Sequence, residues 1–263
     1  MTENLPESGD KLASLRAATP ARIFLPRAGL ALATQANLQF QLDHAEARDA
    51  VHERLDVETL IEALRSRGLE ILRVASAARD RRTYLLRPDL GRELDEASRE
   101  RLAPLAGDYD IVFVVADGLS ARAVSSHAIA LLDEATPAFQ QGLWKLAPVV
   151  VVEQGRVAIG DEIGEILGAI LVAVLIGERP GLSSPDSLGV YLTFAPRVGR
   201  NDAERNCLSN IRSRGMSYSE ASQRLFYLCG EARRRNLTGV DLKDETSLAR
   251  RDDQSPRLGD PER

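Results

Sequence analysis

The sequence of 263 residues predicts an α/β fold: a doubly wound, mostly parallel sheet of the Rossmann-like type, preceded by a mainly helical N-terminal part. Two observations carry this prediction. Apolar, β-branched runs without polar alternation, such as "YDIVFVVA" and "APVVVV", recur in the second half of the chain, and helical patterns separate them. Strands that are apolar on both sides are typical of parallel sheets whose two faces are covered by crossover helices.

The N-terminal part, residues 19–104, has mainly helical patterns. Apolar side chains recur at helical spacing over residues 38–45, and "DVETLIEALRSRG" carries a capping Asp56 at its start and Gly68 past its end. A short apolar segment, "LEILRV", follows. We therefore expect a mainly helical region that leads into the sheet.

The second part, residues 105–244, alternates strands and helices. Four strands are expected, in "YDIVFVVA", "APVVVVEQGR", "ILVAVLIGERPG" and "LGVYLTFAP". Helices are expected in "ARAVSSHAIALLDEATPAF", "GDEIGEILGA", "NDAERNCLSNI" and "SYSEASQRLFYLCGEARRRN". The two ends, residues 1–18 and 245–263, are polar and lack a sustained apolar period, so we expect disordered tails there.

Composition excludes several classes of protein. A net charge of -5 and a pI near 5.4 argue against a nucleic-acid-binding surface. The longest apolar stretch, residues 166–176, is too short to span a bilayer, and no signal peptide opens the chain. The two cysteines, Cys207 and Cys229, lack the spacing of a redox or metal motif. We expect a cytoplasmic protein with neither nucleic acid nor membrane as its partner.

Three polar, glycine-containing segments follow the first three predicted strands of the second part. They are residues 117–120 (Asp-Gly-Leu-Ser), 153–157 (Glu-Gln-Gly-Arg-Val) and 177–181 (Gly-Glu-Arg-Pro-Gly). Parallel strands end at the same edge of a sheet, where ligands bind in this architecture. The segments therefore predict a ligand-binding rim, although glycine-rich connections that bind nothing would have the same composition.

No motif for independent catalysis stands in the chain. Phosphate-binding GxGxxG and GxxxxGK[ST] loops, a GxSxG elbow and an HExxH helix are all absent from the sequence. An independent nucleotide-binding enzyme is therefore disfavoured. A subunit that completes a site together with another chain and a purely structural subunit both remain open.

Long motifs across residues 19–236 resemble the small subunits of ethanolamine ammonia-lyase. They include "TPARIFLPRAGLALATQANLQFQLDHAEARDAV", "YLLRPDLGREL", "GRVAIGDEIGEILGA", "LIGERPGLSSPDSLGVYLTFAPR" and "DAERNCLSNIRSRGMSYSEAS". The resemblance implies an adenosylcobalamin-dependent radical enzyme that converts ethanolamine to acetaldehyde and ammonia. In this family a large subunit holds the substrate, and the small subunit completes the cobalamin site at the interface between the two subunits.

The resemblance also implies three cofactor contacts and no catalytic residue in this chain. Val157 would offer its backbone to the side chains of the corrin ring, Glu178 would accept hydrogen bonds from them, and Cys207 would pack at the same rim. Without the resemblance, the residues themselves favour ordinary packing for Val157 at the end of a strand and an inert core position for Cys207. Glu178 is then equally well half of a solvated ion pair with Arg179. No metal ligand is expected from the protein.

Some relatives carry a longer N-terminal extension that is associated with packaging into a bacterial microcompartment. The region before Thr19 is short and polar here, so the expectation stays a cytoplasmic protein, with encapsulation left open.

Overall fold

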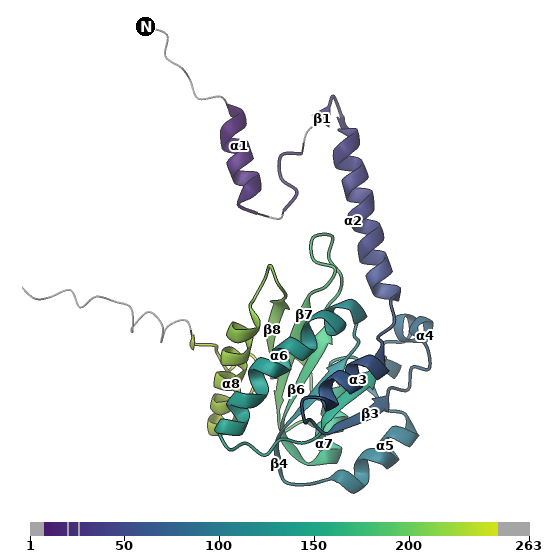
Figure 1. Cartoon of the computed structure of the whole chain (residues 1–263), viewed down its shortest axis with the longest axis vertical. Coiled ribbons are helices and arrows are strands. Elements are labelled where there is room, and N and C mark those ends of the chain that lie inside the picture. Colours follow the sequence, from purple (N-terminus) through teal and green to yellow (C-terminus); the bar gives the residue numbers. More distant parts are fainter. Residues whose placement is uncertain (1–7, 20, 26, 247–263) are drawn as a thin grey trace, which may run out of the picture.

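The computed structural model describes residues 8–19, 21–25 and 27–246, and a six-stranded sheet lies at its centre (Figure 1). The predicted α/β class, with a mostly parallel sheet and a helical N-terminal part, is confirmed. In spatial order the strands are β3 (Ile71–Ala75), β5 (Val149–Glu153), β4 (Tyr109–Ala116), β6 (Ala169–Gly177), β7 (Leu188–Phe194) and β8 (Arg205–Ile211).

The first four strands in this order run parallel, and β7 and β8 are antiparallel additions at one edge. Val114 in the centre of β4 lies opposite Val150 of β5 and Val174 of β6. Helices connect the parallel strands, whereas the connection from β6 to β7 contains no helix, so the chain turns back beside β6. The carboxyl ends of β3, β4, β5 and β6 consequently share one edge of the sheet.

Helices cover both faces of this sheet. Successive side chains of β4 point to opposite faces: Phe113 packs with one core cluster, and Val114 packs with the other. The first cluster lies under α3 (Val57–Arg65), α6 (Ala121–Gln141) and α8 (Tyr218–Arg235), and the second lies under α5 (Glu96–Leu102) and α7 (Ile159–Leu167). Burial on both faces explains why the central positions of these strands are apolar without polar alternation.

One predicted helix is wrong. The segment "NDAERNCLSNI" forms a 3-10 turn, η3 (Asp202–Glu204), followed by strand β8, so Cys207 lies on a strand. The strand is the edge of the sheet and pairs with β7, where Tyr191 lies opposite Cys207. Cys207, Ser209 and Asn210 reach solvent, and pairing with β7 imposes a strand where the local preference for one is weak.

The N-terminal part contains more structure than its composition predicts. Helix α1 (Ser8–Ala17) lies in the segment expected to be disordered, and strand β3, from "LEILRV", belongs to the sheet although it precedes the expected start of the α/β domain at residue 105. The remaining expected tail residues, 1–7 and 247–263, lie outside the described residues. The other elements are β1 (Arg27–Ala28), β2 (Ala31–Leu32), α2 (Thr34–His52), α4 (Arg81–Leu86), η1 (Leu90–Arg92) and η2 (Ala103–Leu105).

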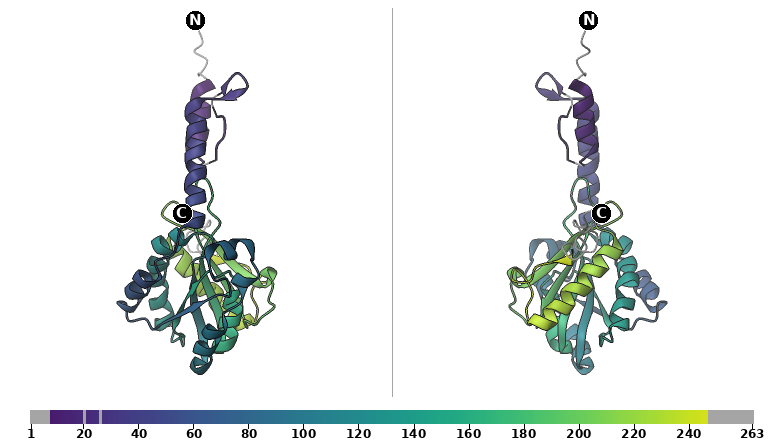
Figure 2. Two further views of the ribbon diagram at one scale, coloured as in Figure 1. Left: turned by 90° about the vertical axis from the view of Figure 1, so that its right-hand side faces the viewer. Right: turned by 90° about the vertical axis from the view of Figure 1, so that its left-hand side faces the viewer.

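Helix α2 stands out from the body of the molecule in every view (Figures 1 and 2). Ala50, near its end, is its one fully buried residue. Within the residues that the structure describes, no helix is both long enough and apolar enough to cross a membrane.

Candidate functional site

The three predicted rim segments come together at the carboxyl edge of β4, β5 and β6. The amide of Leu119 donates to the carbonyl oxygen of Gly177 at 2.9 Å, which joins the segment after β4 to the end of β6. A Cβ atom on Gly177 would lie 2.0 Å from the carbonyl oxygen of Ser120, so only glycine allows this approach. The amide of Gly155 in the segment after β5 donates to Asp117 at 3.1 Å, so the segment after β4 contacts both of the others.

A hollow of about 450 Å³ opens where these segments meet. Two of the residues predicted from the sequence, Val157 and Glu178, line this hollow. Arg156, just before Val157, and Arg179, just after Glu178, line it too. The complete lining is Tyr84, Gly118, Leu119, Arg156, Val157, Ile176, Gly177, Glu178, Arg179 and Tyr191. The hollow therefore combines apolar walls, two aromatic rings and charges of both signs.

The side chain of Glu178 is held in a defined orientation. Its carboxylate accepts a hydrogen bond from the Ser187 hydroxyl and a longer one, 3.3 Å, from the backbone amide of Asn210. Its own amide donates to the carbonyl oxygen of Ser187 at 2.9 Å. The alternative interpretation of Glu178, a solvated ion pair with Arg179, does not occur among the ion pairs of the described residues. Glu178 is thus half-buried and fixed at the wall of the hollow.

Cys207 lies beside the hollow rather than in its wall. The hydroxyl of Tyr191, which does line the hollow, interacts with the Cys207 sulfur across the β7–β8 pair. The pKa of the Cys207 thiol is raised by its protein surroundings, which disfavour the charged thiolate, and the carboxylate of Glu178 adds to this effect. The second cysteine, Cys229, is fully buried in α8 and unpaired, so the structure forms no disulfide between the two.

Tyr84, which the sequence did not point to, contacts the rim segment after β5. The ring of Tyr84 on α4 makes cation–π contacts with two guanidinium groups: Arg81 lies 4.8 Å and Arg156 4.5 Å from its centre. Its hydroxyl donates to the carbonyl oxygen of Gly155 at 3.2 Å. Burial raises the pKa of Tyr84 to about 12. No local signal in the sequence connects α4 to a loop some seventy residues later.

Asp117, considered from the sequence as a possible rim contact, is instead buried beneath the rim, 3% exposed. Its carboxylate accepts from the amide of Gly155 at 3.1 Å and lies 3.7 Å from a guanidinium nitrogen of Arg81. Burial raises the pKa of Asp117 to about 6, and Arg81 and the backbone donors oppose that rise.

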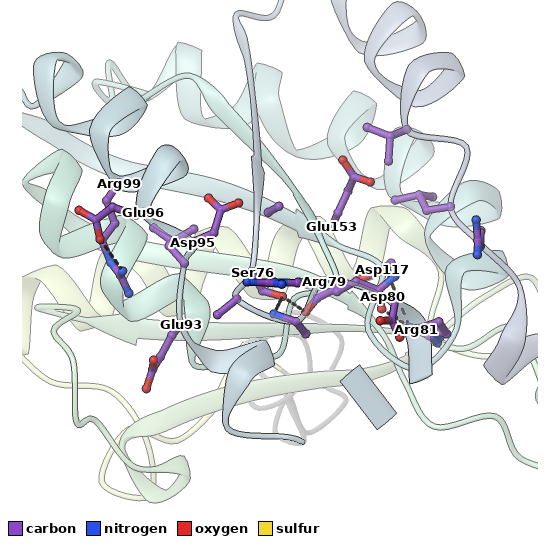
Figure 3. A pocket seen from close by; sticks show the side chains of 18 residues that line it. Ser76, Arg79, Asp80, Arg81, Glu93, Asp95, Glu96, Arg99, Asp117 and Glu153 are labelled. Carbon is purple, nitrogen blue, oxygen red and sulfur yellow. Dashed lines mark hydrogen bonds and ion pairs between the residues drawn. The ribbon is translucent and has the colours of Figure 1, made fainter. Parts of the chain in front are cut away.

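A larger open cleft of about 770 Å³ lies further along the same edge, at the ends of β3 and β5 (Figure 3). Its lining is rich in charges, but most of them already have partners in the protein. Asp80 and Asp95 cap helices α4 and α5, and Glu153 pairs with Arg73 at 2.8 Å. The hollow at the rim is therefore the better candidate for a ligand site. Metal-binding clusters of three His, Cys, Asp or Glu side chains are absent from the described part of the chain.

These features define an α/β protein with an open hollow, its candidate ligand site, at the carboxyl edge of a mostly parallel sheet. The chain belongs to the ethanolamine ammonia-lyase light-chain family: the model of that family, described as "Ethanolamine ammonia-lyase light chain (EutC)", matches residues 9–243.

Curated relatives agree with this assignment. The chain is 55% identical to the ethanolamine ammonia-lyase small subunit of Azotobacter vinelandii, over 96% of this chain and 95% of the relative. It is 57% identical to the small subunit of Xanthomonas campestris pv. campestris, over 90% and 88% of the two chains. For the small subunit of Pseudomonas putida the identity is 52%, over 94% and 93%.

Proposed function

We propose that this chain is the small subunit of an adenosylcobalamin-dependent ethanolamine ammonia-lyase and completes the cobalamin site at the interface with a large subunit. The whole enzyme would convert ethanolamine to acetaldehyde and ammonia. The observation that carries the proposal is the meeting of Val157 and Glu178 in one hollow, with Cys207 beside it, in a chain 52–57% identical to curated small subunits.

The chemistry of the hollow fits a corrin cofactor. A corrin ring is flat and apolar, and primary amide groups surround its edge. The carboxylate of Glu178 can accept hydrogen bonds from amide N–H groups, and Arg156 and Arg179 can donate to amide oxygens. Val157 and Ile176 offer apolar surface to the ring edge.

The division of labour follows from this donor set. When bound, the cofactor would supply the carbon-centred radical that removes hydrogen from the substrate. The residues of this chain would bind one side of the cofactor, orient it and exclude water from the radical chemistry. We assign no catalytic residue to this chain, and the substrate would be held by the large subunit.

Reconstitution tests the proposal. The chain is mixed with the cognate large subunit, adenosylcobalamin and ethanolamine, and acetaldehyde is measured with each protein omitted in turn. Product only when both chains are present is the expected result. If neither a complex nor cobalamin binding appears, the proposal is wrong.

A second experiment separates this role from that of a purely structural subunit. Glu178→Gln and Val157→Gly variants are assembled with the large subunit, and cobalamin affinity is measured for each complex. Normal assembly with unchanged affinity in both variants would favour the structural role.

A further inference from the structure

We propose that Asp117 is a positioning residue of the rim: its buried carboxylate holds the turn of residues 154–157 and thereby presents Val157 to the cofactor. Asp117 does not line the hollow itself. The inference rests on the proposed cobalamin-binding function and adds a residue that acts through the turn.

The turn is held at both backbone polar groups of one residue, Gly155. The Gly155 amide donates to Asp117 at 3.1 Å, and the Gly155 carbonyl oxygen accepts from the Tyr84 hydroxyl at 3.2 Å. Val157 follows two residues later in the wall of the hollow. Residue Gln154, just before, has a left-handed backbone with φ of 55°, a conformation that is unfavourable for a non-glycine residue. Such a turn keeps its shape only where the surroundings impose it.

The carboxylate is itself fixed by a buried arginine. Arg81 of α4 is 7% exposed, and its Nη1 lies 3.7 Å from a carboxylate oxygen of Asp117. Arg81 also donates to the carbonyl oxygens of Gly118 and Val51, both at 2.7 Å. Figure 3 shows Arg81 directed at Asp117, with a dashed line between them. The Asp117–Arg81 pair thus connects the turn after β5 to the end of β4 and to α4.

Protonation of Asp117 would weaken this arrangement, because a neutral carboxyl loses its attraction to Arg81 and accepts hydrogen bonds less strongly. The titratable groups near Asp117 are Arg81 and Tyr84, both on α4. Arg156 on the turn contacts the ring of Tyr84. Burial raises the pKa of Asp117 to about 6, where binding can still be measured. We therefore expect cobalamin affinity to fall as the pH decreases through about 6.

The test compares Asp117→Asn with Asp133→Asn, a matched change at an exposed carboxylate that pairs with Arg67. Each full-length chain is assembled with the cognate large subunit. Affinity for cyanocobalamin is then measured from about pH 5 to about pH 8, a range that includes the pKa of Asp117. Amide hydrogen exchange over residues 154–157 is measured without cofactor.

For Asp117→Asn we expect about tenfold weaker binding, faster exchange in the turn, and loss of the bend in affinity near pH 6. The control should behave as the wild type does. Unchanged exchange, or faster exchange with wild-type affinity, would overturn the positioning role while leaving the cobalamin site intact. A wild-type complex that binds no cyanocobalamin would instead overturn the proposed function. If the variant does not fold, a wild-type affinity that is flat from pH 5 to 8 still refutes the inference.

Discussion

Replacement of Gly177 by alanine should damage the rim more than any other single-methyl change there. An added Cβ would lie 2.0 Å from the carbonyl oxygen of Ser120 and 2.8 Å from that of Asp117, whereas real Cβ contacts are essentially never below 3.0 Å. The obstructing atoms belong to the backbone, so no side-chain rotation relieves the clash. The loop after β4 must move by about 1 Å, which corresponds to a loss of about 2 kcal/mol in the free energy of unfolding.

Urea unfolding of the full chain measures this loss, and Gly230→Ala is the matched control. Gly230 lies on the exposed side of α8 with no atom within 4 Å of an added Cβ, so alanine there should stabilise the helix by up to about 1 kcal/mol. We also expect Gly177→Ala to weaken cobalamin binding, because Gly177 and Glu178 both line the hollow. A Gly177→Ala chain as stable as the wild type would refute the close packing of the loop after β4 on Gly177.

Three further outcomes are expected. Asp161→Asn should lower the free energy of unfolding by about 3 kcal/mol, because the buried guanidinium of Arg205 then loses the carboxylate that accepts two of its hydrogen bonds at 2.6 Å. Urea unfolding measures this loss, and a change near zero would contradict the prediction. Glu178→Gln should weaken cobalamin binding about tenfold without affecting assembly, whereas Glu231→Gln, at a carboxylate in α8 outside the hollow, should leave the affinity unchanged; equal affinities for both variants would remove Glu178 from the site. The folded-state pKa of Asp117 is raised to about 6, so the folded chain binds this proton more tightly than the unfolded chain between about pH 4 and 6. Through this group the free energy of unfolding of the wild type therefore rises as the pH falls across that window, by at most about 3 kcal/mol. The free energy of unfolding of the wild type minus that of Asp117→Asn should become more positive in the same direction, because the variant cannot take up this proton.

The central strands could be predicted because their local composition reflects their surroundings. Strands β4, β5 and β6 are covered on both faces, so their central positions are apolar without polar alternation. Strand β8 could not be predicted in the same way. It lies at the edge of the sheet with several polar residues in solvent, so its pattern is compatible with a helix until β7 is present beside it.

The candidate site divides along the same line. Val157 and Glu178 follow predicted strands, and the rule that parallel strands end at one edge was sufficient to bring them together. That rule could not predict the hydrogen bonds that Asp117 and Tyr84 make with Gly155. Tyr84 and Arg81 come from α4, whose position depends on how the N-terminal part packs against the sheet.

The sequence by itself determined the α/β class, the position of the rim and the family, because each is recorded in local composition or in long contiguous motifs. Only the tertiary structure decided that Asp117 is buried, that Cys207 lies on an edge strand beside the hollow, and that the loop after β4 packs closely on Gly177. These features depend on contacts between segments far apart in the chain. Burial, pKa and strand pairing arise from those contacts, so the sequence that flanks a residue does not reveal them.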